Sequence, residues 1–190
     1  PFVLDMATTT VAANKVKVYD FLGKPLPPGW AVDGQGAPVT AADAAMQFIF
    51  KHPEGGLTPL GGTPAMSSHK GYGLAMMAQI LGGTLSGSAL AARRNVTRRP
   101  GEPDDVGHFF LALNPDAFRA SGSFESDMDD LIDTLHDTPP AQPDEPVLVA
   151  GEPEAAERAR RRIEGIPISP ALATRLREIC ERAAVPYLLD

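Results

Sequence analysis

Residues 61–74 read GGTPAMSSHKGYGL, and this stretch contributes most to the prediction of the fold. Glycines, small hydroxyl side chains and a lysine lie where a loop is expected to become a helix. The apolar residues that follow have the spacing of one helical face: Leu74, Met77, Ala78 and Leu81. The pattern predicts a helix over residues 68–81, with Ser67 or Ser68 as the N-cap and the glycine pair 82–83 as its end.

Lys70 and the two glycines beside it make the start of this helix a candidate binding site. The first turn of a helix exposes backbone N–H groups that attract anions, and a cation there is disfavoured by about 0.3–1 kcal/mol. An internal carboxylate, or a phosphate or carboxylate ligand, would compensate for Lys70. Gly71 and Gly73 each lower helix propensity by about 1 kcal/mol relative to Ala, which indicates that another backbone or a flat ring lies close. The alternative is a glycine-rich helix packed on a neighbour, with Lys70 solvated.

Shorter patterns predict the other elements. Residues 2–7 alternate in character, and apolar runs occupy residues 108–113 and 146–150, so all three segments are expected to be strands. Helices are expected before Gly23, near residues 41–48, over residues 124–135, between Gly151 and Gly165, and after Ser169-Pro170 with Leu172, Leu176, Ile179 and Ala183 buried. This order indicates an α/β or α+β fold. A Rossmann fold is not favoured, because no G-x-G-x-x-G sequence follows a strand.

Composition and charge exclude several classes of protein. The chain has 190 residues and a formal net charge of −7, which argues against a nucleic-acid partner, and no apolar run is long enough to span a bilayer. The histidines lack metal-ligand spacing, so no metal site is predicted. The single Cys180 is expected to be an inert core thiol in a cytoplasmic protein. Because the sequence enters a strand pattern directly at Pro1, we expect a further part of the protein upstream.

Two further places offer polar groups next to predicted strands. Asp5 lies inside an apolar strand pattern, where it either orients a catalytic group or a ligand, or caps the turn that follows. Residues 149–154 would present backbone N–H groups, and Glu152 either accepts a hydrogen bond from a sugar hydroxyl or caps the helix. The arginines of residues 93–99 either touch a phosphate or lie in a solvated loop, and His136 is expected to face solvent.

A set of short stretches follows in a fixed order along the chain. They are DMATT at 5–9, SHKGYGL at 68–74 with ILGGTLSG at 80–87, GHFF at 107–110, VLVAGE at 147–152 and EGIP at 164–167. Together these stretches resemble the malate/L-lactate dehydrogenase family, with order and spacing that agree from residue 1 to about residue 168. That family also includes L-sulfolactate, ureidoglycolate, diketogulonate and Δ1-piperideine-2-carboxylate enzymes.

The resemblance implies a non-Rossmann α/β fold, with a mixed, largely antiparallel sheet flanked by helices, like that of L-sulfolactate dehydrogenase. It also implies a homodimer that binds NAD or NADP. The cofactor contacts of the family carry over onto three places: the opening strand at residues 3–7, the histidine–lysine pair at 69–70 and the glycine turn at 151–153. These residues are Val3, Leu4, Asp5, Met6, Ala7, His69, Lys70, Gly151, Glu152 and Pro153. Pro153 departs from the family pattern, because its ring nitrogen offers no N–H.

In the family, the acid/base histidine and the substrate-binding arginine precede the DMAT stretch, so neither belongs to this sequence, and Asp5 is expected to support the catalytic groups. Residues 1–168 are then the NAD(P)-binding region and residues 169–190 a C-terminal helix. The implied reaction transfers a hydride between NAD(P) and C2 of a 2-hydroxy or 2-oxo acid of the malate or lactate type. The isolated chain is expected to be inactive. The alternative is a non-catalytic nucleotide-binding or interaction domain that lacks the catalytic histidine.

Overall fold

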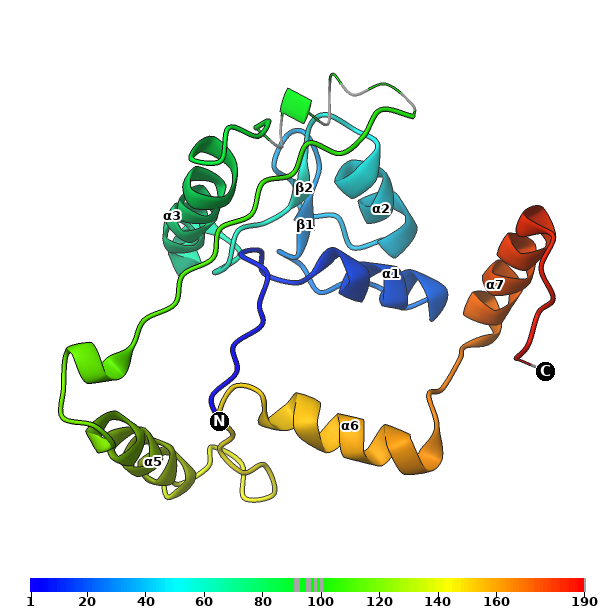
Figure 1. Ribbon diagram of the computed structural model, residues 1–190. Helices are drawn as coiled ribbons and strands as arrows, with labels where there is room; N and C mark the ends of the chain where they lie inside the picture. The colour runs from blue at the N-terminus through cyan, green and yellow to red at the C-terminus, as the bar shows by residue number, and fades with distance from the viewer. Residues whose placement is uncertain (91–92, 95–96, 98, 100, 190) are drawn as a thin grey trace. The chain divides into compact units, whose positions relative to one another are not determined.

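Helices carry most of the regular structure of this chain, for which a computed structural model describes residues 1–90, 93–94, 97, 99 and 101–189. The chain divides into two compact units (Figure 1). The smaller unit comprises Pro1–Asp5 and Phe110–Pro167, and the larger unit comprises Met6–Phe109 and Ile168–Asp190. Each unit is described by itself.

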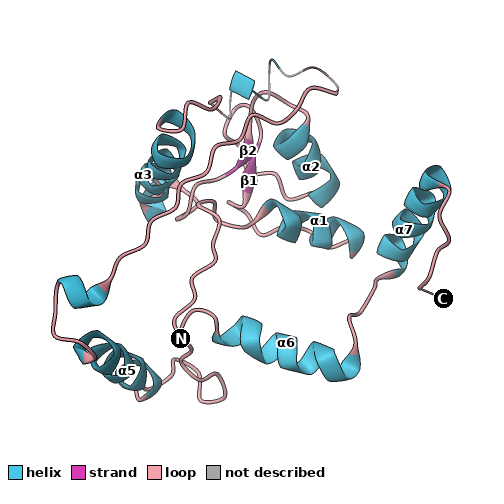
Figure 2. Ribbon diagram, in the orientation of Figure 1, coloured by secondary structure: helices cyan, strands magenta, loops and turns pink. Residues whose placement is uncertain are grey.

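In the larger unit, two helices accompany a small sheet (Figure 2). Strands β1 (Ala31–Val32) and β2 (Gly56–Leu57) pair antiparallel, with Ala31 opposite Leu57. Helix α2 (Ala42–Phe50) contacts both strands, and α1 (Ala13–Phe21) packs on α2. The unit also contains the 3₁₀ turn η1 (Pro64–Met66), α3 (His69–Ala78), the π-helical segment η2 (Gln79–Thr84) and α7 (Pro170–Ala183).

The buried core of the larger unit lies between α1, α2 and β1. Its members are Val11, Val16, Leu26, Ala31, Ala42 and Ala45. Val16 is fully buried, and the small alanines allow the helices and the strand to approach closely. At the edge of this core the rings of Tyr19 and Trp30 meet edge to face, with their centroids 5.0 Å apart. The core therefore anchors the first half of the chain.

Thr58 links the opening segment to this core through a buried polar cluster. Its backbone N–H donates to the Trp30 carbonyl at 3.1 Å, and its hydroxyl donates to the Gly29 carbonyl at 2.6 Å. The Thr10 hydroxyl lies 2.8 Å from the Thr58 hydroxyl and donates to the Pro59 carbonyl at 2.7 Å. The Thr58 hydroxyl also lies 3.4 Å from the Trp30 carbonyl oxygen, so the two hydroxyl protons are shared among four oxygen contacts. The cluster is satisfied only as a whole.

We predict that Thr58→Val lowers the free energy of unfolding of the full-length protein by about 1–3 kcal/mol, since valine keeps the shape but leaves the Gly29 carbonyl without its donor. Urea unfolding measures the change. Thr134→Val is the matched control, because Thr134 is exposed and its hydroxyl donates within its own helix, to the Asp130 carbonyl. Equal effects of the two substitutions would contradict the role of the buried cluster.

The smaller unit contains η3 (Pro115–Ala117), α5 (Ser123–His136) and α6 (Glu152–Glu164). Gly122 precedes α5 and Gly151 precedes α6, with φ of 80° and 99°, so both turns use the left-handed region that favours glycine. Gly165 ends α6 as its C-cap. The predictions of these two helices are confirmed. So is the N-cap of α7, where the Ser169 hydroxyl accepts a hydrogen bond from the Leu172 N–H at 3.3 Å.

Two of the arginines near the end of α6 form ion pairs with glutamates of the same helix. Arg160 donates to Glu157 at 2.7 Å and to Glu164 at 2.6 Å, and Arg161 also pairs with Glu157. Arg160 and Arg161 lower the pKa of the Glu157 carboxyl to about 2. These contacts lie one turn apart, the spacing that stabilises a helix surface. The ion pairs therefore explain Arg160 and Arg161 as residues that stabilise the surface of α6.

The three predicted strands at residues 2–7, 108–113 and 146–150 are wrong, as none of their residues belongs to a strand. A strand needs a repeated ladder of backbone hydrogen bonds. The Val3 N–H donates to the Ala150 carbonyl at 3.0 Å, but this bond is not repeated along the two segments. The described residues therefore form a two-stranded antiparallel sheet, not the larger mixed sheet flanked by helices that the family resemblance implied.

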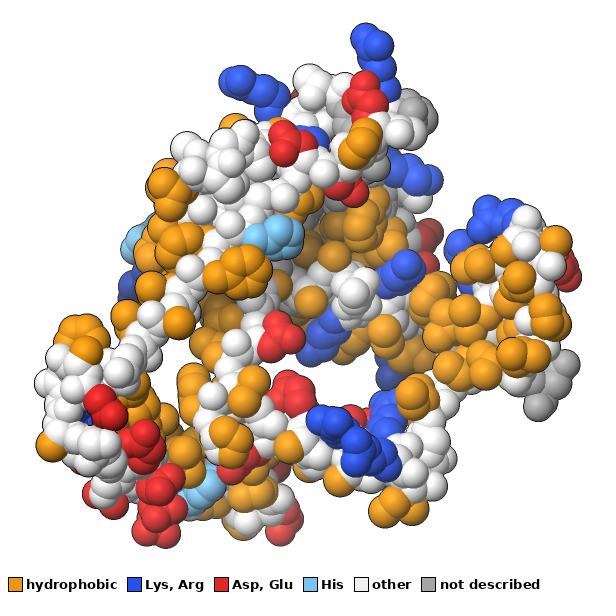
Figure 3. All heavy atoms as spheres, viewed as in Figure 1, with side chains coloured by type: hydrophobic (Ala, Val, Ile, Leu, Met, Phe, Trp, Pro, Cys, Tyr) orange, Lys and Arg blue, Asp and Glu red, His pale blue; other side chains and the backbone are white. Residues whose placement is uncertain are grey.

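Several details of the helices also differ from the predictions. The helical path after α3 continues through the glycine pair 82–83 as the π-helical segment, and the Ser68 side chain makes no capping hydrogen bond. The predicted apolar stripes of α3 and α7 are not buried, with Met77 56% and Ile179 50% exposed. Figure 3 shows hydrophobic side chains gathered on the surface of α7. Cys180 is half-buried, so the prediction of a core thiol is wrong.

Candidate functional site: a glycine turn and a helix start

In the smaller unit, the opening segment lies against the glycine turn that precedes α6. The Val3 N–H donates to the Ala150 carbonyl at 3.0 Å. A Cβ on Gly151 would lie 2.9 Å from the Val3 Cβ and 3.2 Å from the Val3 carbonyl oxygen. With a φ of 99° as well, this position has room and backbone freedom only for glycine. Val3 and Gly151, both predicted cofactor residues, are therefore neighbours, while the side chains of Leu4 and Asp5 are exposed.

Glu152 closes this turn with its side chain. One carboxylate oxygen accepts a hydrogen bond from the Val149 N–H at 2.8 Å. The Nε2 atom of His136, at the end of α5, lies 2.9 Å from the other oxygen and 3.1 Å from the first. The Val149 N–H, followed by His136, holds the pKa of the Glu152 carboxyl below its ordinary value. The carboxylate thus folds back onto the turn, and the cap of α6 is Gly151.

His136 is exposed, as expected, but it also pairs with Glu152, a contact that was not predicted. No pattern in the sequence indicates the pair, because a proline-rich connector separates the two residues by 16 positions. Each residue taken alone has the properties of an exposed helix end. Only the course of the connector brings them together.

The lowered pKa of Glu152 predicts a specific pH dependence of stability. A carboxyl whose pKa is lowered in the folded state stabilises the protein above its unfolded pKa, and this contribution is lost as the pH falls below about 4 and through the lowered pKa. We predict that the difference in free energy of unfolding between the wild type and Glu152→Gln shrinks over this acid range. Urea unfolding between neutral and acid pH measures it. A difference that stays constant with pH would contradict the prediction.

In the larger unit, the continuation of the opening segment pairs with Leu60, whose backbone lies against Gly71 in the first turn of α3. The Leu60 N–H donates to the Thr8 carbonyl at 3.0 Å. A Cβ on Gly71 would overlap the Leu60 carbonyl oxygen and lie 2.6 Å from the Leu60 nitrogen. The close backbone predicted for Gly71 is therefore present, whereas Gly73 has nothing within 4 Å of such a Cβ, and the same expectation for it is wrong.

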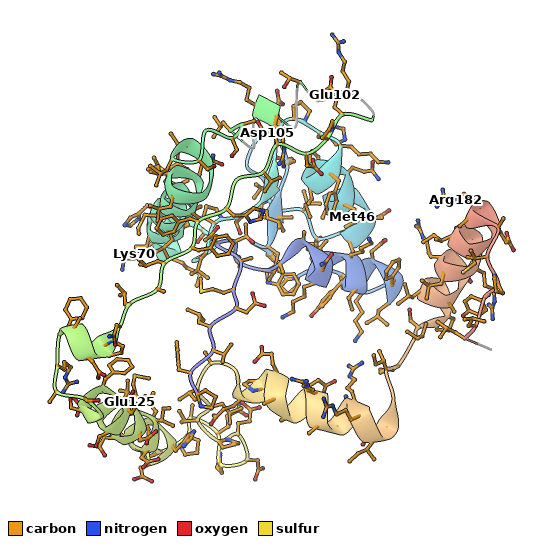
Figure 4. The ribbon with its side chains drawn as sticks, viewed as in Figure 1. Met46, Lys70, Glu102, Asp105, Glu125 and Arg182 are labelled. Atoms are coloured by element: carbon orange, nitrogen blue, oxygen red, sulfur yellow. The ribbon has the colours of Figure 1, made fainter. Side chains whose placement is uncertain are left out.

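His69 and Lys70 occupy the exposed first turn of α3 (Figure 4). That turn contains no acidic residue, so the positive end of the helix and the Lys70 ammonium are not compensated from within it. Met6 and Ala7, which precede Thr8, belong to the same unit and are exposed. This local positive charge fits an anionic ligand.

We predict that Gly71→Ala and Gly73→Ala have effects of opposite sign on stability. Alanine at 71 forces the Leu60 backbone to move and should cost about 1–3 kcal/mol in the free energy of unfolding. Alanine at 73 enters open space and gains helix propensity, up to about 1 kcal/mol. Thermal or urea unfolding of the pair measures the contrast. Similar values for the two variants would show that Leu60 does not constrain the helix.

The predicted site residues are thus divided between the units. Val3, Leu4 and Asp5 with Gly151, Glu152 and Pro153 belong to the smaller unit, and Met6, Ala7, His69 and Lys70 belong to the larger. Within the arginine cluster of residues 93–99, Arg98 lies outside the described residues. In the part of the chain that the structure describes, no cluster of side chains suits a metal ion, and no helix combines the length and apolarity needed to cross a membrane.

Comparison with known proteins identifies the family. Residues 1–177 match the family model of malate/L-lactate dehydrogenase, so the chain belongs to this family. The malate dehydrogenase of Pyrococcus abyssi is 33% identical over 189 residues, which cover 99% of this chain and 50% of that protein. The L-lactate dehydrogenase of Cupriavidus necator is 35% identical over 188 residues, which cover 98% of this chain and 50% of that protein. The chain spans about half the length of these curated relatives.

Solved structures agree with this assignment. The malate dehydrogenase of Entamoeba histolytica superposes with a TM-score of 0.84 at 26% identity, covering 98% of this chain and 52% of that one. The sulfolactate dehydrogenase of Methanocaldococcus jannaschii gives a TM-score of 0.69 at 30% identity, covering 97% of this chain and 49% of that one. The chain therefore shares the fold of the corresponding half of these enzymes.

Proposed function

We propose that this chain is the cofactor-binding part of an NAD(P)-dependent dehydrogenase of 2-hydroxy acids. The observation that carries the proposal is the family match over residues 1–177. Relatives named malate, L-lactate and L-sulfolactate dehydrogenase all act on acids that carry a hydroxyl at C2. The alternative, a non-catalytic nucleotide-binding or interaction domain, is less well supported, because these relatives are named as enzymes.

The residues present fit a nicotinamide dinucleotide. The Lys70 ammonium and the positive end of α3, with the exposed His69 side chain, offer positive charge without an acidic residue in the first turn, which suits a phosphate. At the Gly151 turn, the Glu152 carboxylate is an acceptor for sugar hydroxyls. Val3 to Ala7 complete the proposed cofactor contacts, with Asp5 also supporting the catalytic groups, and Pro153 contributes only its ring and carbonyl.

A bound nicotinamide would supply the hydride acceptor for C2 of the hydroxy acid, and a base would take the hydroxyl proton, so that a 2-oxo acid would form. In this proposal the residues of the chain bind and orient the dinucleotide. The family's acid/base histidine and substrate arginine precede residue 5, so proton exchange is not assigned to any residue here. The choice between NAD and NADP stays open, and malate and lactate are the first substrates to test.

We further propose the quaternary and architectural features that belong to the family resemblance. These are a homodimer and an L-sulfolactate dehydrogenase-like sheet flanked by helices in the complete protein. A division into an NAD(P)-binding region at 1–168 and a C-terminal helix at 169–190 is part of the same proposal, as is a cytoplasmic location. The exposed apolar side chains of α3 and α7 support the association of this chain with further protein surface.

The test is cofactor binding by the full-length protein and its Lys70→Ala variant. We expect NADH or NADPH to bind the wild type, and Lys70→Ala to raise Kd about tenfold with an unchanged Tm, because an exposed cation at a ligand contributes to binding but not to packing. Fluorescence titration gives Kd, and a thermal melt gives Tm. Turnover of malate, lactate and other 2-oxo and 2-hydroxy acids with both cofactors then identifies the substrate.

Lys17→Ala is the matched control, since it removes one exposed positive charge from α1 and leaves α3 intact. Failure of the wild type to bind either cofactor would refute the proposed function. A large fall in Tm with unchanged affinity for Lys70→Ala would instead favour a packing role for this helix start.

A further inference from the structure

The glycine turn before α6 is held from two sides. On one side the Val3 N–H donates to the Ala150 carbonyl at 3.0 Å. On the other side the Glu152 carboxylate receives the Val149 N–H at 2.8 Å and the His136 imidazole at 2.9 Å. His136 is the last residue of α5, so this contact ties the end of one helix to the beginning of the next.

The contact requires a proton on the His136 nitrogen that faces Glu152. An ionised carboxylate only accepts hydrogen bonds, so the Nε2 atom that faces Glu152 must bear a proton. The neutral Nε2–H tautomer and the imidazolium both meet this requirement. Either form of the ring therefore donates this hydrogen bond to the carboxylate.

Glu152 retains acceptor capacity after these contacts. A carboxylate offers about four lone-pair sites, and the Val149 N–H and the His136 Nε2–H are two donors. The sites that are left can accept two further hydrogen bonds, the number that a ribose diol donates. His136 and Glu152 are partly exposed, at 39% and 33% of their side-chain surface, so the pair adds little to stability and stays open to a ligand.

We propose that His136 is a positioning residue for dinucleotide binding, which holds the Glu152 carboxylate in one orientation before a ribose hydroxyl pair arrives. This inference rests on the proposed function. Holding the side chain in advance removes part of the rotamer entropy that binding would otherwise cost. His136 itself does not touch the ligand in this proposal, and it acts through Glu152 alone.

The experiment compares full-length wild type, His136→Ala and His136→Gln in titrations with NADH and NADPH and in steady-state kinetics. We expect His136→Ala to weaken binding by about three- to tenfold and to raise the cofactor KM with little change in kcat, as expected for loss of one partly exposed charge-assisted contact. His136→Gln should restore affinity, because its amide N–H donates to the carboxylate from a similar reach. In a Glu152→Gln background, His136→Ala should have a much smaller further effect.

Asp127→Asn is the matched control. It breaks another exposed pair of α5, with Arg119 at 2.6 Å, that does not involve the glycine turn, and it should leave Kd unchanged. Equal affinity of His136→Ala and wild type would overturn the inference, as would failure of His136→Gln to restore binding. Faster amide exchange of residues 149–152 in His136→Ala with an unchanged Kd would mean a purely structural contact and would also overturn it. A wild type that binds neither cofactor would instead refute the proposed function and remove the ground for this inference.

Discussion

Backbone pairing of the opening segment with residues 58–60 is the interaction on which the larger unit's candidate site depends. The Thr10 N–H donates to Thr58, and the Leu60 N–H donates to Thr8, so the two segments are joined on both sides of Pro59. Thr58 in turn is bonded to the loop that enters β1. A hydroxyl buried in this position costs free energy unless every partner is present. The core therefore sets the position of Leu60, and Leu60 sets the position of α3.

Within each unit, the absence of a side chain at one glycine allows two segments to approach closely. At Gly71 the backbone of Leu60 occupies the volume of a Cβ, and at Gly151 the Val3 residue does the same. The two sites arise independently, one inside a helix and one at a left-handed turn. The residue against Gly151 is Val3 of the opening segment, and the residue against Gly71 is Leu60, which is paired to that segment at Thr8. Close backbone approach is the condition under which N–H groups can also reach a ligand.

The sequence predicts those features that depend on local chemistry. Apolar spacing over residues 124–135 predicted α5, and Gly151 and Gly165 predicted the ends of α6. Ser169-Pro170 predicted the start of α7, and the low helix propensity of Gly71 indicated a close backbone. The failures concern features that depend on a partner. The alternation of side chains over residues 2–7 indicates two different faces, but it does not show whether a neighbouring strand exists. In the same way, the apolar spacing in α3 does not ensure that another element covers its apolar face. The His136–Glu152 pair was missed for the same reason, since it depends on the path of a connector.

Local charge, not net charge, is the relevant quantity for the proposed cofactor. The chain is acidic overall, with a formal charge of −7, yet the proposed ligand carries phosphates. Exposed charges farther apart than about 8–10 Å are largely screened at physiological salt, so distant carboxylates weigh little against Lys70 at the start of α3. The arginines of α6 are paired with Glu157 and Glu164. The two candidate places thus differ in sign: the start of α3 supplies positive charge for phosphates, and the glycine turn supplies a carboxylate for hydroxyls.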